Sequence, residues 1–400
     1  MNYNNEFRIL DTGTIYFDNG ASTLKPLRVI DKVRECMLEY PSNAHRGDYK
    51  MSLKSSSMFE KTRETVKNFI NAKSTEEIIF TSGSTESLNQ IIYGYFMNKL
   101  NEGDEVLITK SEHASNILPW FDLEKKIGIK VKYIPLNNDF TFSIDNLISS
   151  ITDKTKVVSL AEITNVIGDI RNIKEITKIC HEKGIKVVVD AAQSAGHIKI
   201  DVQDSDADFY AISSHKMLGP NGVGVLYGKK ELLSELDSIK KGGGMTISFD
   251  DSNSIVYKEL PYSLEAGTQN IPGVIGFMEA INYINEIGID NIHNYCLNLK
   301  KYLVSKLEKL DNIIIYNKDV DGFTVTFNIK DVFAQDTAIY LDKYNICVRS
   351  GDHCDKKLKD EISITNTVRV SLYFYNTKEE IDKLVEVLNN DNILEESIGV

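Results

Sequence analysis

Residues 185–191 read IKVVVDA, and residues 208–228 read DFYAISSHKMLGPNGVGVLYG. Both stretches start with a short run rich in β-branched and aromatic residues, which favours a strand. Similar runs recur from residue 76 onward and alternate with stretches of helical length. This alternation is typical of a mostly parallel sheet covered by helices, so we predict an α/β fold. The predicted strands cover 76–81, 105–110, 129–136, 156–163, 185–191, 208–213 and 222–228, with helices at 85–99, 118–126 and 173–183.

The rest of the chain predicts a second, smaller domain. After the glycine-rich stretch KKGGGMTISF at 240–249, a long helical region runs from 274 to 310 and is interrupted near Gly288. The remaining segments read as strand, helix, strand, strand and helix, which indicates a small α+β domain. These segments cover 322–329, 334–344, 346–350, 367–374 and 378–390. We predict a large domain at 21–285 and a small domain at 286–400, with residues 1–20 packed on the small domain.

Composition and charge limit the classes of function. The 400 residues are 42% hydrophobic and 26% charged, as in an ordinary globular chain. The formal net charge of −12 argues against a nucleic-acid partner, because such proteins cluster Lys and Arg to displace counterions. No apolar run reaches the roughly 18 to 20 residues that span a bilayer, and the first residues lack the pattern of a signal peptide. We therefore expect a cytoplasmic protein without a membrane or nucleic-acid partner.

The five cysteines are odd in number and show no CxxC spacing. They indicate neither a disulfide framework nor a zinc site, and we expect no bound metal. Cys347 lies among apolar neighbours, as a structural cysteine does. Cys354 instead follows the predicted strand at 346–350 on a loop with charged neighbours, where an exposed nucleophile is expected. By polarity alone, a structural and a nucleophilic role are equally open for Cys354.

Two strand ends carry candidate catalytic groups, because open α/β sheets bind ligands at the carboxyl ends of their parallel strands. Lys216 follows the strand at 208–213 beside apolar residues, so its amine could be held neutral and form a Schiff base with an aldehyde cofactor. Asp190 ends the strand at 185–191, where a buried carboxylate needs a partner such as a pyridinium nitrogen. The alternatives are a solvated surface lysine and a carboxylate that caps the next helix.

A third segment, FTSGSTESLNQII at 80–92, places Ser84 and Thr85 between a strand and an amphipathic helix. Helix N-termini bind anions, which suits a phosphate, although such a turn is also a plain helix cap. Gln193, three residues after Asp190, is placed to reach a ring hydroxyl. An aldehyde trap, a pyridinium partner and a phosphate cradle are together what pyridoxal 5′-phosphate (PLP) requires, so PLP is the predicted cofactor.

These segments belong to a larger set of eleven ordered motifs. The motifs are YFDNGAST, NAHRGDYKMS, FTSGSTES, EHASNILPW, TNVIG, VDAAQSAGH, SSHKMLGPNGVG, GGGM, EAGTQN, RSGDHC and RVSLYFYNT. Over nearly its whole length the chain resembles the class V, fold type I PLP enzymes, specifically the cysteine desulfurase and selenocysteine lyase group of the SufS type (group II). The resemblance implies an aspartate aminotransferase-like fold, with a mostly parallel central sheet and a small α+β C-terminal domain.

The resemblance also implies how the cofactor is held. His113 would stack on the pyridine ring, a role that suits an aromatic imidazole. Ser84, Ser213 and His215 would bind the phosphate. Thr268 would reach the phosphate from the neighbouring subunit, which implies a homodimer with shared active sites.

Further positions match substrate-binding residues of the family. Arg369 would clamp the substrate carboxylate through its guanidinium fork, and Asn165 would lie near the ring hydroxyl and the substrate. Arg349 and His45, together with Arg46, would line the same cleft. Surface salt bridges are the alternative explanation for the arginines.

The implied reaction converts L-cysteine to L-alanine. Lys216 would release the cofactor to the substrate and remove the Cα proton, while Asp190 keeps the ring nitrogen protonated. The Cys354 thiolate would then attack the substrate sulfur, so that the sulfur ends as a persulfide for delivery to an acceptor protein or a reductant. The pathway served, whether iron–sulfur cluster assembly, tRNA thiolation or selenium handling, stays open.

Several positions depart from the family pattern. Asp352 stands where the family usually has a histidine, and a carboxylate two residues before Cys354 should disfavour the thiolate, with His353 as a partial offset. Gln269 replaces a usual proline. Another class V enzyme is therefore an alternative, either a selenocysteine lyase, a different C–S lyase or an aminotransferase. A PLP-binding protein without turnover is a remote alternative.

Overall fold

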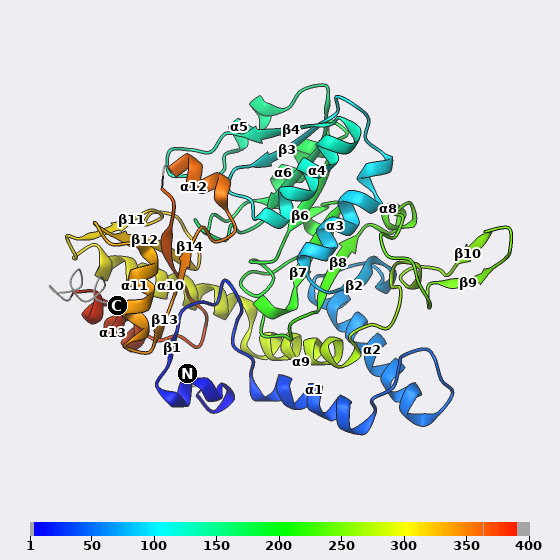
Figure 1. Cartoon of the computed structure of the whole chain (residues 1–400), viewed down its shortest axis with the longest axis horizontal. Coiled ribbons are helices and arrows are strands. Elements are labelled where there is room, and N and C mark those ends of the chain that lie inside the picture. The colour runs from blue at the N-terminus through cyan, green and yellow to red at the C-terminus, as the bar shows by residue number, and fades with distance from the viewer. Residues whose placement is uncertain (1–3, 363, 390–400) are drawn as a thin grey trace.

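The computed structural model describes residues 4–362 and 364–389, and its larger lobe is built on a seven-stranded sheet (Figure 1). The strands of this sheet are β2 (Ile78–Thr81), β3 (Glu105–Thr109), β4 (Lys130–Ile134), β5 (Thr155–Ala161), β6 (Lys186–Asp190), β7 (Phe209–Ser213) and β8 (Gly224–Gly228). They lie in the order β2-β8-β7-β6-β5-β3-β4. Strands β3 to β7 pair in parallel, whereas β8 is antiparallel to both β2 and β7. The predicted α/β fold with a mostly parallel sheet is thus confirmed.

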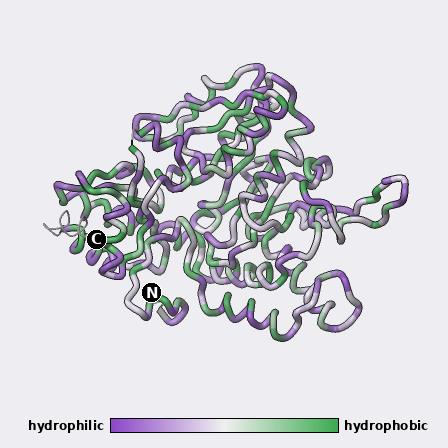
Figure 2. Tube along the Cα trace, viewed as in Figure 1, coloured by the Kyte–Doolittle hydropathy of each residue, from purple (hydrophilic) through white to green (hydrophobic). Residues whose placement is uncertain are grey.

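Apart from the edge strand β4, both faces of the large sheet are buried, which explains the nearly continuous apolar runs in its sequence. Along β6, Val187 and Val189 face one hydrophobic core and Val188 faces the other, as the two-residue period of a strand requires. Helices α3 (Ser84–Gly94) and α4 (Leu118–Ile127) pack in the second of these cores, and α6 (Ile173–His181) packs in the first. Figure 2 shows the hydrophobic stretches along the central strands. Because β5, β6 and β7 are parallel, their carboxyl ends open together at one edge.

A layer of long helices lies against the first core. Helix α9 (Ile271–Ile287) is largely buried and packs against α1 (Leu27–Glu39) and α2 (Lys50–Phe69), beside which it runs in Figure 1. Gly276 permits the close approach, since a Cβ atom there would lie 2.5 Å from Cγ2 of Val33. Helix α10 (Ile289–Leu307) starts directly after Gly288, the predicted point of interruption, and leads into the second lobe.

The second lobe contains a four-stranded antiparallel sheet. Its strands, in spatial order, are β11 (Ile313–Ile315), β12 (Thr324–Ile329), β15 (Thr367–Ser371) and β14 (Arg349–Gly351). Helices α10, α11 (Ala334–Asp342) and α13 (Lys378–Leu388) share a hydrophobic core with it. The sequence did not indicate β11 or the short helix α12 (Lys356–Ile362). The domain boundaries at 21 and 286 stay predictions. Residues 1–3 of the predicted N-terminal segment and residues 390–400 of the predicted small domain lie outside the described part of the chain.

The N-terminal segment bridges the two lobes. Strand β1 (Ile15–Tyr16) pairs in parallel with β13 (Ile346–Cys347) of the second lobe. Asn19 Nδ2 donates to the carbonyl of Ser371 in β15 at 2.7 Å. On the other side, the carbonyl of Gly20 accepts from Nε2 of Gln193 at 2.9 Å, just beyond β6. Residues 15–20 therefore hold the edge of the large sheet against the small one.

A hairpin begins within the glycine-rich stretch at 240–249, for which no structure was predicted from the sequence. Strands β9 (Thr246–Phe249) and β10 (Ile255–Tyr257) form this hairpin, which projects from the large lobe in Figure 1. The short helices α5 (Ile144–Ser150), α7 (Val202–Ser205) and α8 (Lys230–Ser234) complete the described α-helices. Within residues 4–362 and 364–389, no helix is both long and apolar enough to cross a membrane.

Candidate active site

A cavity of about 200 Å³ lies where β5, β6 and β7 end against the small sheet. Most of the predicted site residues meet there, although they come from segments far apart in the sequence. The predicted residues that line it are Ser84, Thr85, His113, Asn165, Asp190, Gln193, Ser213, His215, Lys216, Arg349, Cys354 and Arg369. Both lobes therefore contribute to one site.

Lys216 and Asp190 are the central ionisable pair of the cavity. Lys216 follows β7 in a single 3-10 turn, Ser214–Lys216, and is partly accessible through the cavity. Burial lowers the pKa of its amine to about 8, against the opposing effect of Asp190. Asp190 ends β6 and accepts from the backbone N–H of Ala192 at 3.0 Å. Burial raises the pKa of its carboxyl to about 6. The amine of Lys216 therefore loses its proton more readily than that of an ordinary lysine, beside a buried carboxyl group.

The backbone next to Lys216 is held by the N-terminal segment. The carbonyl of His215 accepts from Nζ of Lys25 at 2.9 Å and from Oγ1 of Thr23 at 3.1 Å. The backbone N–H of Thr23 donates to the same carbonyl at 3.0 Å. A carbonyl with this many donors cannot easily reorient, so the peptide that carries Lys216 is fixed.

Ser84 and Ser213 form a polar corner at the start of α3. Oγ of Ser213 accepts from the backbone N–H of Ser84 at 2.8 Å and lies 2.8 Å from Oγ of Ser84. Oγ1 of Thr85 lies 2.7 Å from Oγ of Ser115, which the sequence analysis did not single out. The N-cap residue Gly83 has no side chain with which to cap α3. Backbone N–H groups at such a helix start attract an anion.

His113 projects from the loop after β3. Its Nδ1 accepts from the backbone N–H of Ser115 at 3.1 Å, so this nitrogen carries no proton. Burial, assisted by the charge of Lys216, lowers the pKa of the imidazole to about 4. The ring is therefore neutral at physiological pH, which is the state suited to stacking on an aromatic ring.

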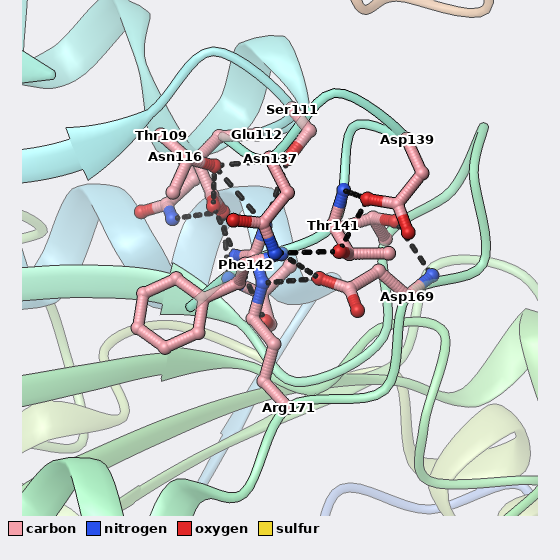
Figure 3. A network of polar contacts seen from close by, with 12 residues as sticks. Thr109, Ser111, Glu112, Asn116, Asn137, Asp139, Thr141, Phe142, Asp169 and Arg171 are labelled. Atoms are coloured by element: carbon pink, nitrogen blue, oxygen red, sulfur yellow. Dashed lines mark hydrogen bonds and ion pairs between the residues drawn. The ribbon is translucent and has the colours of Figure 1, made fainter. Parts of the chain in front are cut away.

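A buried ion-pair network holds the His113 loop (Figure 3). Glu112, directly before His113, accepts from Arg171 at 2.6 Å and from the backbone N–H of Ala161 at 2.6 Å. Arg171 also contacts Asp169 at 3.2 Å and donates to Ser111 and Thr109. Glu112 and Arg171 have no exposed side-chain surface. The His113 loop and the end of β5 are thereby fixed to each other.

Arg369 and Arg349 enter the cavity from the small sheet. Arg369 is buried; it donates to the carbonyl of Asn165 at 2.8 Å and lies 3.3 Å from Oδ1 of Asp18. Burial lowers the pKa of its guanidinium to about 10. Its Nε is buried and has no partner among the described residues. The chain passes close to the guanidinium at Gly20, where a Cβ atom would lie 2.9 Å from Cζ.

Cys354 lies between β14 and α12 and is exposed. Its Sγ is 3.9 Å from a guanidinium nitrogen of Arg349. Its carbonyl accepts from the backbone N–H of Ala114 at 2.9 Å, and the carbonyl of His353 accepts from Nδ2 of Asn165 at 2.8 Å. These bonds attach the cysteine loop to the large lobe at the cavity.

His45 and Thr268 are not brought to this cavity within one chain. They line a second cavity together with Arg46 and Gly267. Nε2 of His45 lies 3.0 Å from Glu60, and Arg46 donates to the carbonyl of Gly267 at 3.2 Å. In a single chain, His45 and Thr268 therefore do not line the cavity that contains Lys216.

The residues that support the site were not predicted from the sequence. Asp18 and Gly20 lie within the motif YFDNGAST, and Glu112 lies within EHASNILPW. These motifs could therefore have pointed to them as residues near the site. Arg171 lacked such an indication, because nothing in its local sequence pairs it with a residue 59 positions earlier.

Comparison with known families agrees with this geometry. The profile described as aminotransferase class V matches residues 15–384. The chain belongs to the class V aminotransferase family. It is 42% identical over 374 residues to a protein of Halalkalibacterium halodurans named probable cysteine desulfurase, covering 94% of this chain and 92% of the relative. A protein of the same name from Staphylococcus aureus is 41% identical over 93% of this chain and 91% of the relative.

Solved structures show the same similarity. A cysteine desulfurase from Thermococcus onnurineus superposes with a TM-score of 0.93 at 34% identity, covering 100% of this chain and 98% of that one. A cysteine desulfurase from Escherichia coli gives a TM-score of 0.91 at 32% identity, covering 98% and 97% of the two chains. The fold expected from the resemblance is therefore confirmed.

Proposed function

We propose that this class V enzyme is a PLP-dependent cysteine desulfurase, which converts L-cysteine to L-alanine and retains the sulfur on Cys354. The observation that carries the proposal is the single cavity lined jointly by Lys216, Asp190, Arg369 and Cys354. A lysine, a carboxylate, a carboxylate-binding arginine and an exposed thiol are the groups that this reaction needs. The similarity to proteins named cysteine desulfurase supports the same function.

The residues around Lys216 fit the cofactor. When bound, PLP supplies an aldehyde that joins to an amine and a ring that accepts an electron pair. Asp190 would hold the ring nitrogen, because a buried carboxylate without a full ion pair gains from a pyridinium partner. The uncapped start of α3, with Ser84 and Ser213, would hold the phosphate. The neutral ring of His113 would cover the ring face.

Arg369 would bind the carboxylate of the amino acid. Its guanidinium lines the cavity and is oriented by Asn165 and Asp18, so a fixed cation is in place for the carboxylate. Binding the carboxylate there would orient the Cα–H bond of the substrate. The amine of Lys216, whose pKa burial lowers to about 8, would then accept the Cα proton in its neutral form.

Cys354 would accept the sulfur. Its thiolate attacks the sulfur of the bound cysteine, so that an S–S bond forms and the C–S bond breaks. The electron pair of the broken bond stays on the Cβ atom of the substrate. This carbon takes up a proton and becomes the methyl group of the alanine that is released. The transferred sulfur is oxidised to the sulfane level, the carbon is reduced, and the two changes balance. A guanidinium nitrogen of Arg349 lies 3.9 Å from Sγ of Cys354.

The active form would be a homodimer of the SufS type. Thr268 lies in the second cavity, away from the site of its own chain, so it would serve the phosphate of a partner. Large apolar side chains are exposed around this region, which is typical of a protein interface. They include Met37, Leu38, Tyr49, Met51, Leu53, Ile247, Phe249, Ile255 and Val256. The hairpin β9–β10 and the segment between α1 and α2 project on the same side in Figure 1.

The persulfide would pass to a thiol acceptor, either a protein or a small reductant. Exposure of Cys354 supports this step, because an acceptor must reach the terminal sulfur.

Absorbance and product assays test the function. Purified protein should show the visible absorbance of bound PLP and release equal amounts of alanine and sulfide from L-cysteine with a reductant. Cys354→Ala should keep the absorbance and lose both products, while Cys347→Ala, a matched change on β13, should keep both. If Cys354→Ala still turns over L-cysteine at the wild-type rate, the nucleophile is assigned wrongly. A keto acid product would identify an aminotransferase instead.

A further inference from the structure

The nucleophile loop has an unusual backbone. His353 and Cys354 both lie in the left-handed region, at φ of 56° and 58°. The backbone N–H of Asp355 donates to the carbonyl of Asp352 at 3.0 Å, which closes a four-residue turn around them. Two consecutive residues with positive φ are the mark of a type I′ turn, which ordinarily selects Asn and Gly. A histidine and a cysteine hold this shape only if other contacts enforce it.

Asp352 supplies a contact from within the turn. Its Oδ1 accepts from the backbone N–H of Cys354 at 2.9 Å. An aspartate that accepts from the backbone two residues ahead forms an Asx-turn, which stabilises this local shape. The contacts to the large lobe reach the carbonyls of His353 and Cys354, from Asn165 and Ala114. Asp352 therefore supplies the hydrogen-bond acceptor for the backbone N–H of Cys354.

We propose that Asp352 is a positioning residue for the nucleophile, resting on the proposed desulfurase function. Its carboxylate oxygen fixes the turn so that the thiol of Cys354 lies at the cavity beside Arg349 and in reach of a sulfur atom held near Lys216. The sequence alone suggested that Asp352 acts through its charge, against the thiolate. The structure assigns it a geometric role, with the guanidinium of Arg349 near Sγ to counter the charge.

Two substitutions separate geometry from charge. Asp352→Asn removes the charge but keeps an oxygen that accepts from Cys354, whereas Asp352→Ala removes both. We expect Asp352→Ala to lower kcat for alanine formation by about 10- to 100-fold with little change in KM, because the thiol is misplaced while the carboxylate clamp is untouched. Asp352→Asn should retain most of the wild-type kcat. Asp360→Asn, an exposed charge on α12, is the matched control.

Alkylation of Cys354 by iodoacetamide, followed by mass spectrometry, separates position from reactivity. The thiol of Asp352→Ala should react at least as fast as that of the wild type, since a nearby negative charge has been removed. Loss of kcat together with slow alkylation would overturn the proposal, because it would mean a less reactive thiol. Equal losses of kcat in the Asn and Ala variants would also overturn it, since charge would then be the cause.

Amide hydrogen exchange tests the turn without catalysis. Exchange in a peptide spanning residues 349–358 should be faster in Asp352→Ala than in the wild type and near the wild-type rate in Asp352→Asn. Unchanged exchange in Asp352→Ala would overturn the role in the turn. If the wild-type protein forms no alanine, the proposed function fails, and the exchange result still decides the role of Asp352.

Discussion

Arg349 and Arg369 are paired directly across strands β14 and β15, and both line the same cavity. Their surroundings differ. Arg369 is buried and oriented by Asn165 and Asp18, whereas Arg349 is partly exposed and lies 3.9 Å from Sγ of Cys354. One strand pair thus presents a buried, oriented guanidinium and a second, partly exposed guanidinium next to the thiol.

Replacing Arg369 should therefore affect substrate binding. We expect Arg369→Lys to raise KM for L-cysteine by roughly tenfold or more, because an ammonium cannot reproduce the guanidinium fork. Arg349→Lys should leave KM closer to the wild-type value and slow persulfide formation. Steady-state and single-turnover kinetics measure the two effects. Equal changes of KM in both variants would contradict this division.

The pH dependence of cofactor capture should follow Lys216. Burial lowers the pKa of its amine from 10.5 to about 8, so the nucleophilic neutral form dominates above pH 8. The rate at which cofactor-free protein captures PLP should rise with pH and level off above about 8, as followed by stopped-flow absorbance. A midpoint near 10.5 would show an ordinary solvated lysine. Lys216→Arg, whose side chain stays charged, should not capture PLP at any pH in this range.

The same shift affects stability. Between pH 8 and 10.5 the unfolded chain binds a proton that the folded lysine has released. The contribution of Lys216 to the stability of the cofactor-free protein should therefore increase as the pH rises through this window. Denaturation of the wild type and Lys216→Met at both ends of the window measures the difference.

The stability of the protein should be sensitive to loss of one partner in the ion pair between Glu112 and Arg171. Arg171→Met leaves Glu112 buried without its cation, which should cost about 3–5 kcal/mol. Lys174→Met is the matched control, because it breaks an exposed pair with Asp204 worth about 0–1 kcal/mol. Urea denaturation of the two variants checks the order. Equal midpoints would mean that the buried pair is not coupled to folding.

The exposed hairpin should matter for dimer formation. Ile247 and Phe249 are 69% and 76% exposed in the single chain. If they are buried between subunits, Phe249→Glu should weaken the dimer by about 10- to 100-fold, because a buried apolar side chain of this size contributes roughly 1.5–3 kcal/mol. Phe333→Glu, on a side chain 69% exposed in the small lobe, is the control. Sedimentation velocity that finds both variants equally dimeric would remove the hairpin from the interface.

Much of the large lobe could be predicted because its pattern is local. Its central strands are apolar on both faces, and α6 was predicted from residue 173, where it begins. Helix α12 was missed because its sequence is mostly polar. The hairpin β9–β10 was missed because its apolar strands are only four and three residues long and the first of them follows a run of glycines.

The site was predictable at strand ends and less so elsewhere. Lys216 and Asp190 could be located because each directly follows or ends an apolar strand. The role of Asp352 could not be predicted, since a backbone with positive φ at His353 and Cys354 leaves no mark in residues that rarely adopt it. The partnership of Glu112 with Arg171 depends on a fold that brings two loops together.

The N-terminal bridge has a consequence for synthesis of the protein. Asn19 and Ser371 are hydrogen-bonded across 352 positions, and Gly20 contacts both Gln193 and the neighbourhood of Arg369. The contacts of residues 19 and 20 with β15 can therefore form only after almost the whole chain has been synthesised. A product of premature termination before β15 lacks one wall of the site, however well its large sheet folds. The complete cavity, with Arg369 as part of its lining, can therefore form only after translation has passed β15.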